Sequence, residues 1–163
     1  MESLPAMRIE LKPIGFVKTP FTRPEQMLAA CEKGLSTPTI STIEILPEYA
    51  EGLKGLEGFS HAFVIYFLHE AHKVELTTHP GPPTVQDLPR VGVFASRSQY
   101  RPNHLALRLV KLVKISDCEV TVQGLDAING TPVIDLKPYV AGFDRPREHK
   151  QAPWYDWLEA AQE

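Results

Sequence analysis

With 163 residues, 43% of them hydrophobic and 23% charged, the chain has the composition of one globular domain with a full core. The formal charge of -3 argues against a protein coated with basic surface, because nonspecific nucleic-acid binding depends on neutralising phosphates. The longest apolar run, Ala62 to Leu68, is far shorter than the roughly 20 residues that span a bilayer, and the N-terminus lacks a signal-peptide layout. We therefore expect a cytoplasmic protein that makes no contact with membranes.

Fifteen prolines and ten glycines favour many short strands joined by turns. In chain order, the predicted strands are Ile9 to Val17, Thr39 to Leu46, His61 to Leu68, Lys73 to Thr78, Arg90 to Ala95, Leu105 to Ile115, Glu119 to Leu125 and Thr131 to Leu136. Short helices are predicted at Pro47 to Leu53, within Glu25 to Lys33, and at Trp154 to Ala161. The segment Leu105 to Ile115 also fits a helical face, but Glu119 to Leu125 resembles its hairpin partner, which favours a strand.

These elements predict a mainly β fold: a single closed or nearly closed β-barrel of mixed antiparallel strands with a few short helices. Residues 1–145 would form the barrel domain, and residues 146–163 a tail with a short helix that belongs to the same domain. The segment Thr78 to Pro89 contains four prolines and one glycine, and its length is typical of a functional loop or a dimer arm.

The most informative segment, Gly92 to His104, reads G-V-F-A-S-R-S-Q-Y-R-P-N-H and joins an apolar strand to a polar loop. Arg97 and Arg101 offer planar forks of donors that suit a carboxylate or a phosphate. Ser96 adds a hydroxyl group, and a proline stiffens the turn that presents Asn103. The segment therefore indicates a ligand-binding loop, although a surface turn whose arginines pair with nearby carboxylates would also fit.

A second polar group lies on the predicted strand near residue 135. Asp135, Lys137 and Tyr139 alternate along the chain, so their side chains point to one side. Polar groups on one face of an apolar strand are costly in a core unless they are paired, which favours a cavity lining. An edge strand with its polar face in water is the alternative.

Histidines and cysteines give no metal or disulfide pattern. His61 and His69 are eight residues apart, which at roughly 3.3 Å per residue is too far to share one ion. Cys31 and Cys118 form no C-x-x-C pair. We expect neither a metal site nor a disulfide framework.

The polar loop resembles the signature of the TsaA-like (TrmO) family, which usually reads F-A-T-R-S-P-x-R-P-N-P-I-G-L-S. This chain keeps Phe94-Ala95, Arg97-Ser98 and Arg101-Pro102-Asn103. Three further blocks follow the family's order, at residues 14–21, 55–61 and 125–139, so that the resemblance covers about residues 8 to 145. The chain looks like a short form without the extra C-terminal domain of long bacterial members.

The resemblance implies a β-barrel that binds S-adenosylmethionine and methylates N6 of threonylcarbamoyladenosine in tRNA. It also implies a homodimer. The cofactor-binding positions that it implies are His69, Glu70, Phe94, Ser96, Arg97, Arg101, Asn103, Asp126, Ala127, Ile128, Asn129, Gly130 and Thr131.

Methyl transfer to a urea-like nitrogen suggests the catalytic roles, because the delocalised lone pair makes a poor nucleophile and a nearby base should help. Asp135 is the first candidate for this base and Tyr139 the second, while Lys137 would hold an anionic substituent such as a threonyl carboxylate. The chain departs from the family pattern at His104, Ala106 and Asn129, among other positions. A noncatalytic cofactor-binding protein, or a methyltransferase for another RNA or a small molecule, therefore stays as an alternative.

Overall fold

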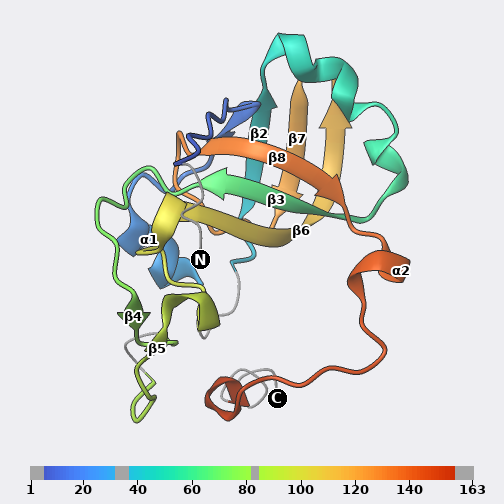
Figure 1. The fold of residues 1–163 in the computed structure, drawn as a ribbon. Helices are drawn as coiled ribbons and strands as arrows, with labels where there is room; N and C mark the ends of the chain where they lie inside the picture. Colours follow the sequence, from blue (N-terminus) through green and yellow to red (C-terminus); the bar gives the residue numbers. More distant parts are fainter. Residues whose placement is uncertain (1–5, 32–36, 82–84, 157–163) are drawn as a thin grey trace.

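The computed structural model of this chain describes residues 6–31, 37–81 and 85–156, and its ribbon is dominated by one curved sheet (Figure 1). Six strands close in the order β1-β2-β7-β6-β3-β8, and each neighbouring pair runs antiparallel. The strands are β1 (Gly15–Lys18), β2 (Ile40–Ile45), β3 (His61–Phe67), β6 (Leu105–Ser116), β7 (Glu119–Gln123) and β8 (Pro132–Pro138). The predicted closed barrel is confirmed.

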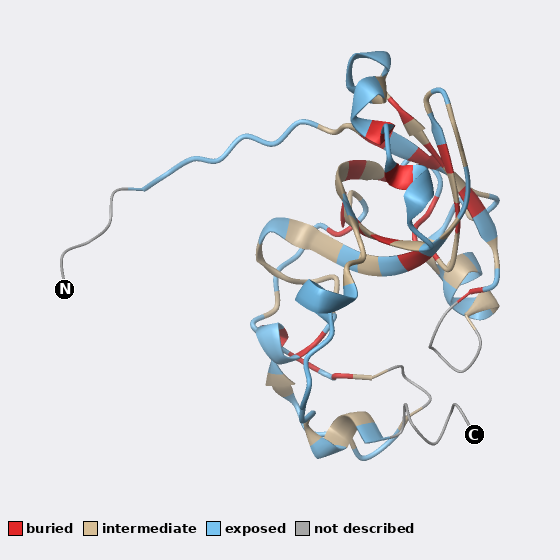
Figure 2. Cartoon of the chain, turned by 90° about the vertical axis from the view of Figure 1, so that its right-hand side faces the viewer, coloured by how far each residue is buried: buried red, intermediate tan, exposed pale blue. Residues whose placement is uncertain are grey.

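The barrel core follows from the alternation of apolar residues along these strands. Ile43, Val64, Val120 and Val122 are fully buried, while their neighbours in the sequence are more exposed. Figure 2 shows buried stretches, in red, along the curved strands. Side chains two residues apart share one face of a strand, so each β-branched series fills the interior of the barrel.

The hairpin β6–β7 confirms that the ambiguous segment from Leu105 is a strand. Ser116 is the register partner of Glu119 across a two-residue turn in which Asp117 has a φ of 31°. The pairing register shifts between Leu112 and Lys114, which marks a β-bulge. A bulge adds local twist, and strong twist helps a small sheet to close on itself.

The shorter elements are helical turns and one small ribbon. They are α1 (Pro24–Ala30), η1 (Pro47–Leu53), η2 (Leu56–Gly58), η3 (Val93–Ala95), η4 (Pro102–His104), α2 (Ala141–Asp144), η5 (Pro153–Tyr155), and the pair β4 (Thr77–Thr78) and β5 (Val91–Gly92). The predicted helix at Pro47 to Leu53 is confirmed as a 3₁₀-helix. The predicted helix within Glu25 to Lys33 is α1, although residues 32–36 lie outside the described residues.

Three predicted strands are shorter than the sequence pattern suggests. Ile9 to Val17 was expected to be a strand, but pairing begins only at Gly15, after Pro13, which cannot donate to a ladder. Lys73 to Thr78 pairs only at its last two residues. Arg90 to Ala95 pairs at Val91–Gly92 and then turns into η3, which points Phe94 outward.

Beyond β8 the chain leaves the barrel. After α2 it runs below the barrel toward η5, as the orange and red part of Figure 1 shows. The Tyr155 hydroxyl donates a hydrogen bond of 3.2 Å to the carbonyl oxygen of Ala95. The predicted helix at Trp154 to Ala161 is described only as far as residue 156, where η5 is a single 3₁₀ turn. The division into a barrel of residues 1–145 and a tail stays a prediction.

Candidate functional site

The signature loop, residues 93–104, is held in shape by its own serines. Ser96 is buried, and its hydroxyl donates 2.8 Å to the carbonyl oxygen of Val93. The same Ser96 Oγ accepts from the backbone N–H of Ser98 at 3.2 Å, and Ser98 Oγ accepts from the N–H of Tyr100 at 3.3 Å. Such hydroxyl-to-backbone bonds stabilise consecutive turns, so the loop's own side chains hold its shape.

Arg101 holds the backbone of this loop together. Its guanidinium donates to the carbonyl oxygens of Ser96 at 3.0 Å, Val93 at 3.2 Å and Ser98 at 3.4 Å. The planar fork of an arginine can reach several acceptors at once, which a lysine could not do with the same geometry. Sequence reasoning gave Arg101 a direct ligand contact, whereas the structure directs these donors to the loop backbone.

The other polar side chains of the loop lie near its outer surface. Asn103 is exposed and has a left-handed backbone with a φ of 65°. The guanidinium of Arg97 donates to the carbonyl oxygen of Leu107 at 3.4 Å, which ties the loop to β6. His104 Nδ1 lies 3.1 Å from the carbonyl oxygen of Gln99.

A cavity of about 580 Å³ opens between η3 and the outer face of β3 and β6. Pockets of roughly 300–1,000 Å³ are typical of small-molecule sites. Three predicted cofactor residues line it, Phe94, Ser96 and Arg97, and Phe94 is 78% exposed. We call it the loop cavity. Its other lining residues are Phe63, Ala95, Leu107, Arg108, Leu109 and Tyr155.

Sequence reasoning missed Phe63, Leu107 and Leu109 as site residues. In the barrel register, Phe63 is the partner of Leu109, and Leu107 is the partner of Ile65. These side chains alternate with the buried Val64 and therefore point outward. The signal that could have found them is an apolar residue at the outward position of each of two adjacent strands.

Five other predicted residues surround a second and much smaller cavity, of about 50 Å³. His69, Glu70, Asp126, Ala127 and Ile128 line it, together with α1 and Gln99 of the signature loop. This volume is well below the range of small-molecule pockets. The structure therefore divides the predicted cofactor residues between two places, with the signature loop bordering both.

Asp126 and Arg108 connect the two cavities, because Arg108 lines the loop cavity and Asp126 the smaller one. Arg108 Nη1 lies 4.0 Å from Asp126 Oδ2, and Arg108 Nε donates to the carbonyl oxygen of Gly124 at 3.2 Å. The hydroxyl of Tyr66 donates to Asp126 Oδ1 at 2.5 Å. The carboxylate of Asp126 thus has Tyr66 on one side and Arg108 on the other.

Burial and this carboxylate change the acidity of two neighbouring groups. Burial, followed by the charge of Asp126 and the hydrogen bond to it, raises the pKa of Tyr66 well above its ordinary value. Burial, then Asp126, also raises the pKa of the Cys31 thiol. A thiol with a raised pKa is a weak nucleophile at neutral pH, so Cys31 is not set up for covalent catalysis.

The turn at 126–131 uses its predicted ligand groups for internal contacts. Asn129 Oδ1 accepts from the N–H of Thr19 at 3.3 Å, and the Asn129 N–H donates to the carbonyl oxygen of Phe21 at 2.6 Å. Thr131 is buried, and its hydroxyl donates 2.7 Å to the carbonyl oxygen of Ile128. Gly130 has a φ of 81°, a conformation that favours glycine.

Asp135 and Lys137 lie on β8 and Tyr139 directly after it, and β8 is the strand next to β3. Lys137 Nζ is 3.2 Å from Asp135 Oδ2. Lys137 is the register partner of Phe63, and the ring centroid of Tyr139 is 6.1 Å from that of Phe63. Phe63 lines the loop cavity, so the predicted catalytic face is one strand away from it. Asp135 also lines another cavity, at the end of the barrel near η1.

Among residues 6–31, 37–81 and 85–156, no group of three or more His, Cys, Asp or Glu side chains is placed to hold a metal ion. The same part of the chain contains no helix with the length and apolar character needed to cross a membrane.

A barrel with this signature loop belongs to a defined protein class. Residues 16–145 match the family model of the tRNA-methyltransferase O N-terminal domain (TrmO_N), and the chain belongs to this family. The predicted family membership is confirmed.

Relatives of different length show the same similarity. A probable S-adenosyl-L-methionine-binding protein from Methanothermobacter thermautotrophicus is 40% identical over 85% of this chain and 95% of its own length. The tRNA (adenine(37)-N6)-methyltransferase of Rattus norvegicus is 32% identical over 92% of this chain. The crystal structure of TrmO from Pseudomonas aeruginosa superposes with a TM-score of 0.70 at 28% identity, covering 90% of this chain. The chain spans 35% of the rat enzyme and 63% of the Pseudomonas chain.

Proposed function

We propose that this protein is a methyltransferase that uses S-adenosylmethionine to methylate N6 of an adenosine in tRNA, with threonylcarbamoyladenosine as the acceptor. The observation that carries the proposal is the preformed signature loop beside a cavity of about 580 Å³, in a chain that belongs to the TrmO family. S-adenosylmethionine is the cofactor.

The loop cavity has the chemistry that this cofactor needs. Arg97 and Arg108 place two cations on its wall for the carboxylate of the methionine part. The exposed ring of Phe94 offers a stacking surface for the adenine. Asp126, paired with Arg108, adds a fixed negative charge nearby. When bound, S-adenosylmethionine supplies a methyl group on a sulfonium that is its own leaving group.

Several other predicted cofactor residues support the site by holding the loops around it. Arg101 holds the backbone of the signature loop, and Asn129 holds the 126–131 turn against the segment after β1. His69 and Glu70 close the smaller cavity on the other side of the loop. Asn103, Ala127, Ile128, Gly130 and Thr131 stay proposed contacts of the cofactor.

The chain's own residues must then position the acceptor nitrogen and relieve it of its proton. Asp135 is the proposed base, because its carboxylate is half exposed on β8, the strand next to β3, whose Phe63 lines the loop cavity. Lys137 neutralises this carboxylate in the free protein and would bind an anionic substituent of the acceptor. Tyr139 is the second candidate for the base. Neighbouring strands lie about 4.8 Å apart, so one strand's width separates this face from the cavity wall.

A specific observation favours one second candidate, a noncatalytic cofactor-binding protein. The Methanothermobacter relative, which this chain covers almost completely, is named only for cofactor binding, whereas the rat methyltransferase is about three times as long as the matched part. In this candidate function the protein binds the cofactor, and Asp135, Lys137 and Tyr139 bind no methyl acceptor.

We further propose that the protein is a homodimer, with the proline-rich loop near residues 78–89 beside the interface, and that it acts in the cytoplasm on intracellular tRNA. Loops of this length are uncommon in a compact domain unless they have a function. Residues 82–84 of this loop lie outside the described residues.

Incubation with methyl-labelled S-adenosylmethionine and total tRNA, followed by nucleoside analysis, tests the proposed activity. Label in an N6-methylated adenosine derivative is the expected result. Label in no nucleoside, combined with calorimetric binding of S-adenosylhomocysteine, would favour the noncatalytic candidate.

A further inference from the structure

The chain beyond β8 leaves the protein and then returns to it. Residues 141–151 are all exposed, so this stretch packs little against the barrel. At η5 the burial changes, because Trp154 and Tyr155 are half-buried and the indole nitrogen of Trp154 is buried. The turn at η5 therefore lies against the protein, whereas the stretch that leads to it lies in solvent.

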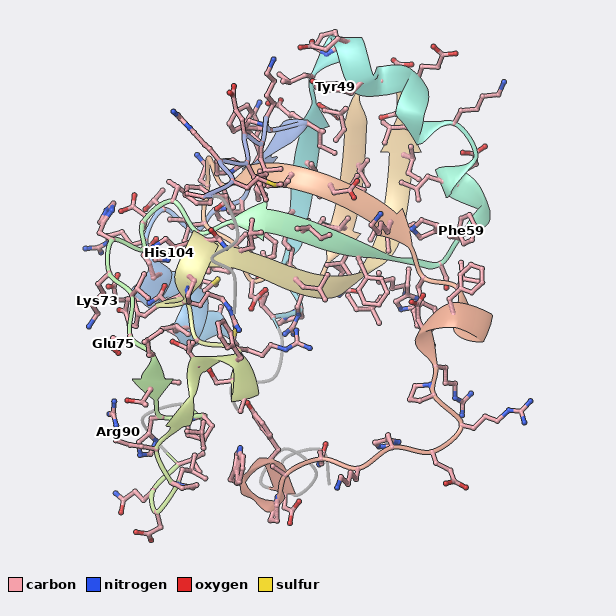
Figure 3. All side chains as sticks on the ribbon, in the orientation of Figure 1. Tyr49, Phe59, Lys73, Glu75, Arg90 and His104 are labelled. Atoms are coloured by element: carbon pink, nitrogen blue, oxygen red, sulfur yellow. The ribbon has the colours of Figure 1, made fainter. Side chains whose placement is uncertain are left out.

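The place to which the chain returns is the signature loop. The hydroxyl of Tyr155 donates 3.2 Å to the carbonyl oxygen of Ala95, a residue 60 positions earlier in the sequence that belongs to η3. Figure 3 shows side chains between η5 and this loop, below the barrel. The hydrogen bond thus attaches the end of the described chain to the same loop whose backbone Arg101 holds.

Tyr155 also forms part of the wall of the loop cavity. Among the described residues beyond β8, it is the one that lines this cavity. The other walls come from η3 and the residues after it, and from the outer face of β3 and β6. An aromatic side chain with a polar end suits such a position, because the ring offers a large contact surface and the hydroxyl fixes its direction.

The turn at η5 does not fill the space over the strands. Leu107 and Leu109, on the outer face of β6, are 41% and 42% exposed. If η5 only shielded these side chains, its own side chains would pack directly on them, as in a protein interior. A cavity of about 580 Å³ is present there instead. Apolar walls around a space of this size are typical of a ligand site.

We propose that Tyr155 contacts S-adenosylmethionine, with its ring as one wall of the loop cavity and its hydroxyl bond to Ala95 holding the ring in place. This inference rests on the proposed function and adds a residue to its cofactor site. The family match ends at residue 145, so the contact comes from a part of the chain outside that match.

Calorimetry with S-adenosylhomocysteine on the full chain tests the contact. Tyr155→Ala should weaken binding about ten-fold, as the loss of a buried ring contact commonly does. Tyr155→Phe keeps the ring and loses only an exposed hydrogen bond, so it should weaken binding by about three-fold.

Tyr49→Ala is the matched control for these variants. Tyr49 is a tyrosine of η1 that is 38% exposed and does not line the loop cavity. Figure 3 shows it at the top of the barrel, whereas η5 lies below the barrel. This variant should bind S-adenosylhomocysteine with the affinity of the parent.

Protection of a thiol distinguishes a contact from a structural role. In a Cys31→Ser, Cys118→Ser background, Tyr155→Cys and Tyr49→Cys are labelled with a maleimide. Saturating S-adenosylhomocysteine should slow labelling at position 155 several-fold and leave the rate at position 49 unchanged. Equal rates at position 155 with and without the ligand would overturn the contact even if Tyr155→Ala weakens binding, because the loss would then be structural.

The same measurements separate the two possible failures. A parent protein that binds S-adenosylhomocysteine, with a Tyr155→Ala variant of equal affinity, would overturn the role of Tyr155 and leave the proposed function. A parent protein that does not bind S-adenosylhomocysteine would overturn both.

Discussion

The hydroxyl of Tyr66 donates a 2.5 Å hydrogen bond to the carboxylate of Asp126, and so connects the barrel interior with the turn beside the site. Tyr66 is only 2% exposed and comes from the inner face of β3. Asp126 also faces Arg108, at 4.0 Å. Tyr66→Phe removes the donor and leaves the ring, so we expect a loss of about 1.5–3 kcal/mol in the free energy of unfolding, measured by urea denaturation. A loss below about 0.5 kcal/mol would show that water replaces the hydroxyl.

The same pair predicts a pH dependence of stability in the alkaline range. The folded state raises the pKa of Tyr66 above its ordinary value of 10.0, mainly through burial. The folded protein therefore holds its proton more tightly than the unfolded chain, and this contribution to stability is complete below about pH 10 and lost as the pH rises further. The stability of the parent should fall more steeply above pH 10 than that of Tyr66→Phe. Parallel curves would contradict the assignment.

Gly15 is predicted to be essential for the close approach of β1 and β2. A Cβ atom at this position would overlap the carbonyl oxygen of Glu44. Gly15→Ala should therefore lower the free energy of unfolding by about 1–3 kcal/mol, because the backbone must move to relieve the overlap. Gly52→Ala is the control, since a Cβ there meets nothing within 4 Å. Equal stabilities of the two variants would contradict the close approach.

The sequence predicts those features of the structure that depend on residues close together in the chain, and it does not predict which segments pair. His61 to Leu68 alternates cleanly, and the strand is found at His61–Phe67. Met7 to Leu11 alternates just as cleanly, yet it is no strand in the single chain because alternation specifies a face and not a pairing partner. Alternation shows that a segment can form a strand. Whether it does so depends on a neighbouring strand with which it can pair.

The site shows the same limit. The residue types of the signature loop predicted a ligand-binding loop, and Phe94, Ser96 and Arg97 do line a cavity. The sequence does not predict which acceptors a guanidinium contacts, and the donors of Arg101 bind carbonyl oxygens of the loop backbone. Phe63 was missed because its role depends on the register between β3 and β6, which closure of the barrel sets.

Arg101 offers a test of indirect support for the cofactor. Arg101→Ala frees the carbonyl oxygens of Val93 and Ser96, so the signature loop should lose its shape and the affinity for S-adenosylhomocysteine should fall by about 1.5–3 kcal/mol in calorimetry. Arg101→Lys, which keeps the charge but not the planar fork, should recover only part of the loss. Unchanged affinity in both variants would show that the serines alone hold the loop.

Asp135 and Lys137 test the proposed acceptor face. Asp135→Asn keeps the size of the side chain and removes its charge, and should lower turnover by about 10²–10⁴-fold, the usual contribution of a general base. Lys137→Ala should mainly weaken binding of the acceptor. Both variants should bind the cofactor nearly as well as the parent, because neither residue lines the loop cavity. Turnover like that of the parent in both variants would mean that this face is structural.

Methyl transfer to a defined pair of tRNAs, one carrying threonylcarbamoyladenosine and one carrying unmodified adenosine at the same position, tests the central claim most directly. With methyl-labelled S-adenosylmethionine, label should enter N6 of threonylcarbamoyladenosine in the first tRNA and be absent from the second. A protein that binds the cofactor and labels neither tRNA would contradict the assignment of this acceptor.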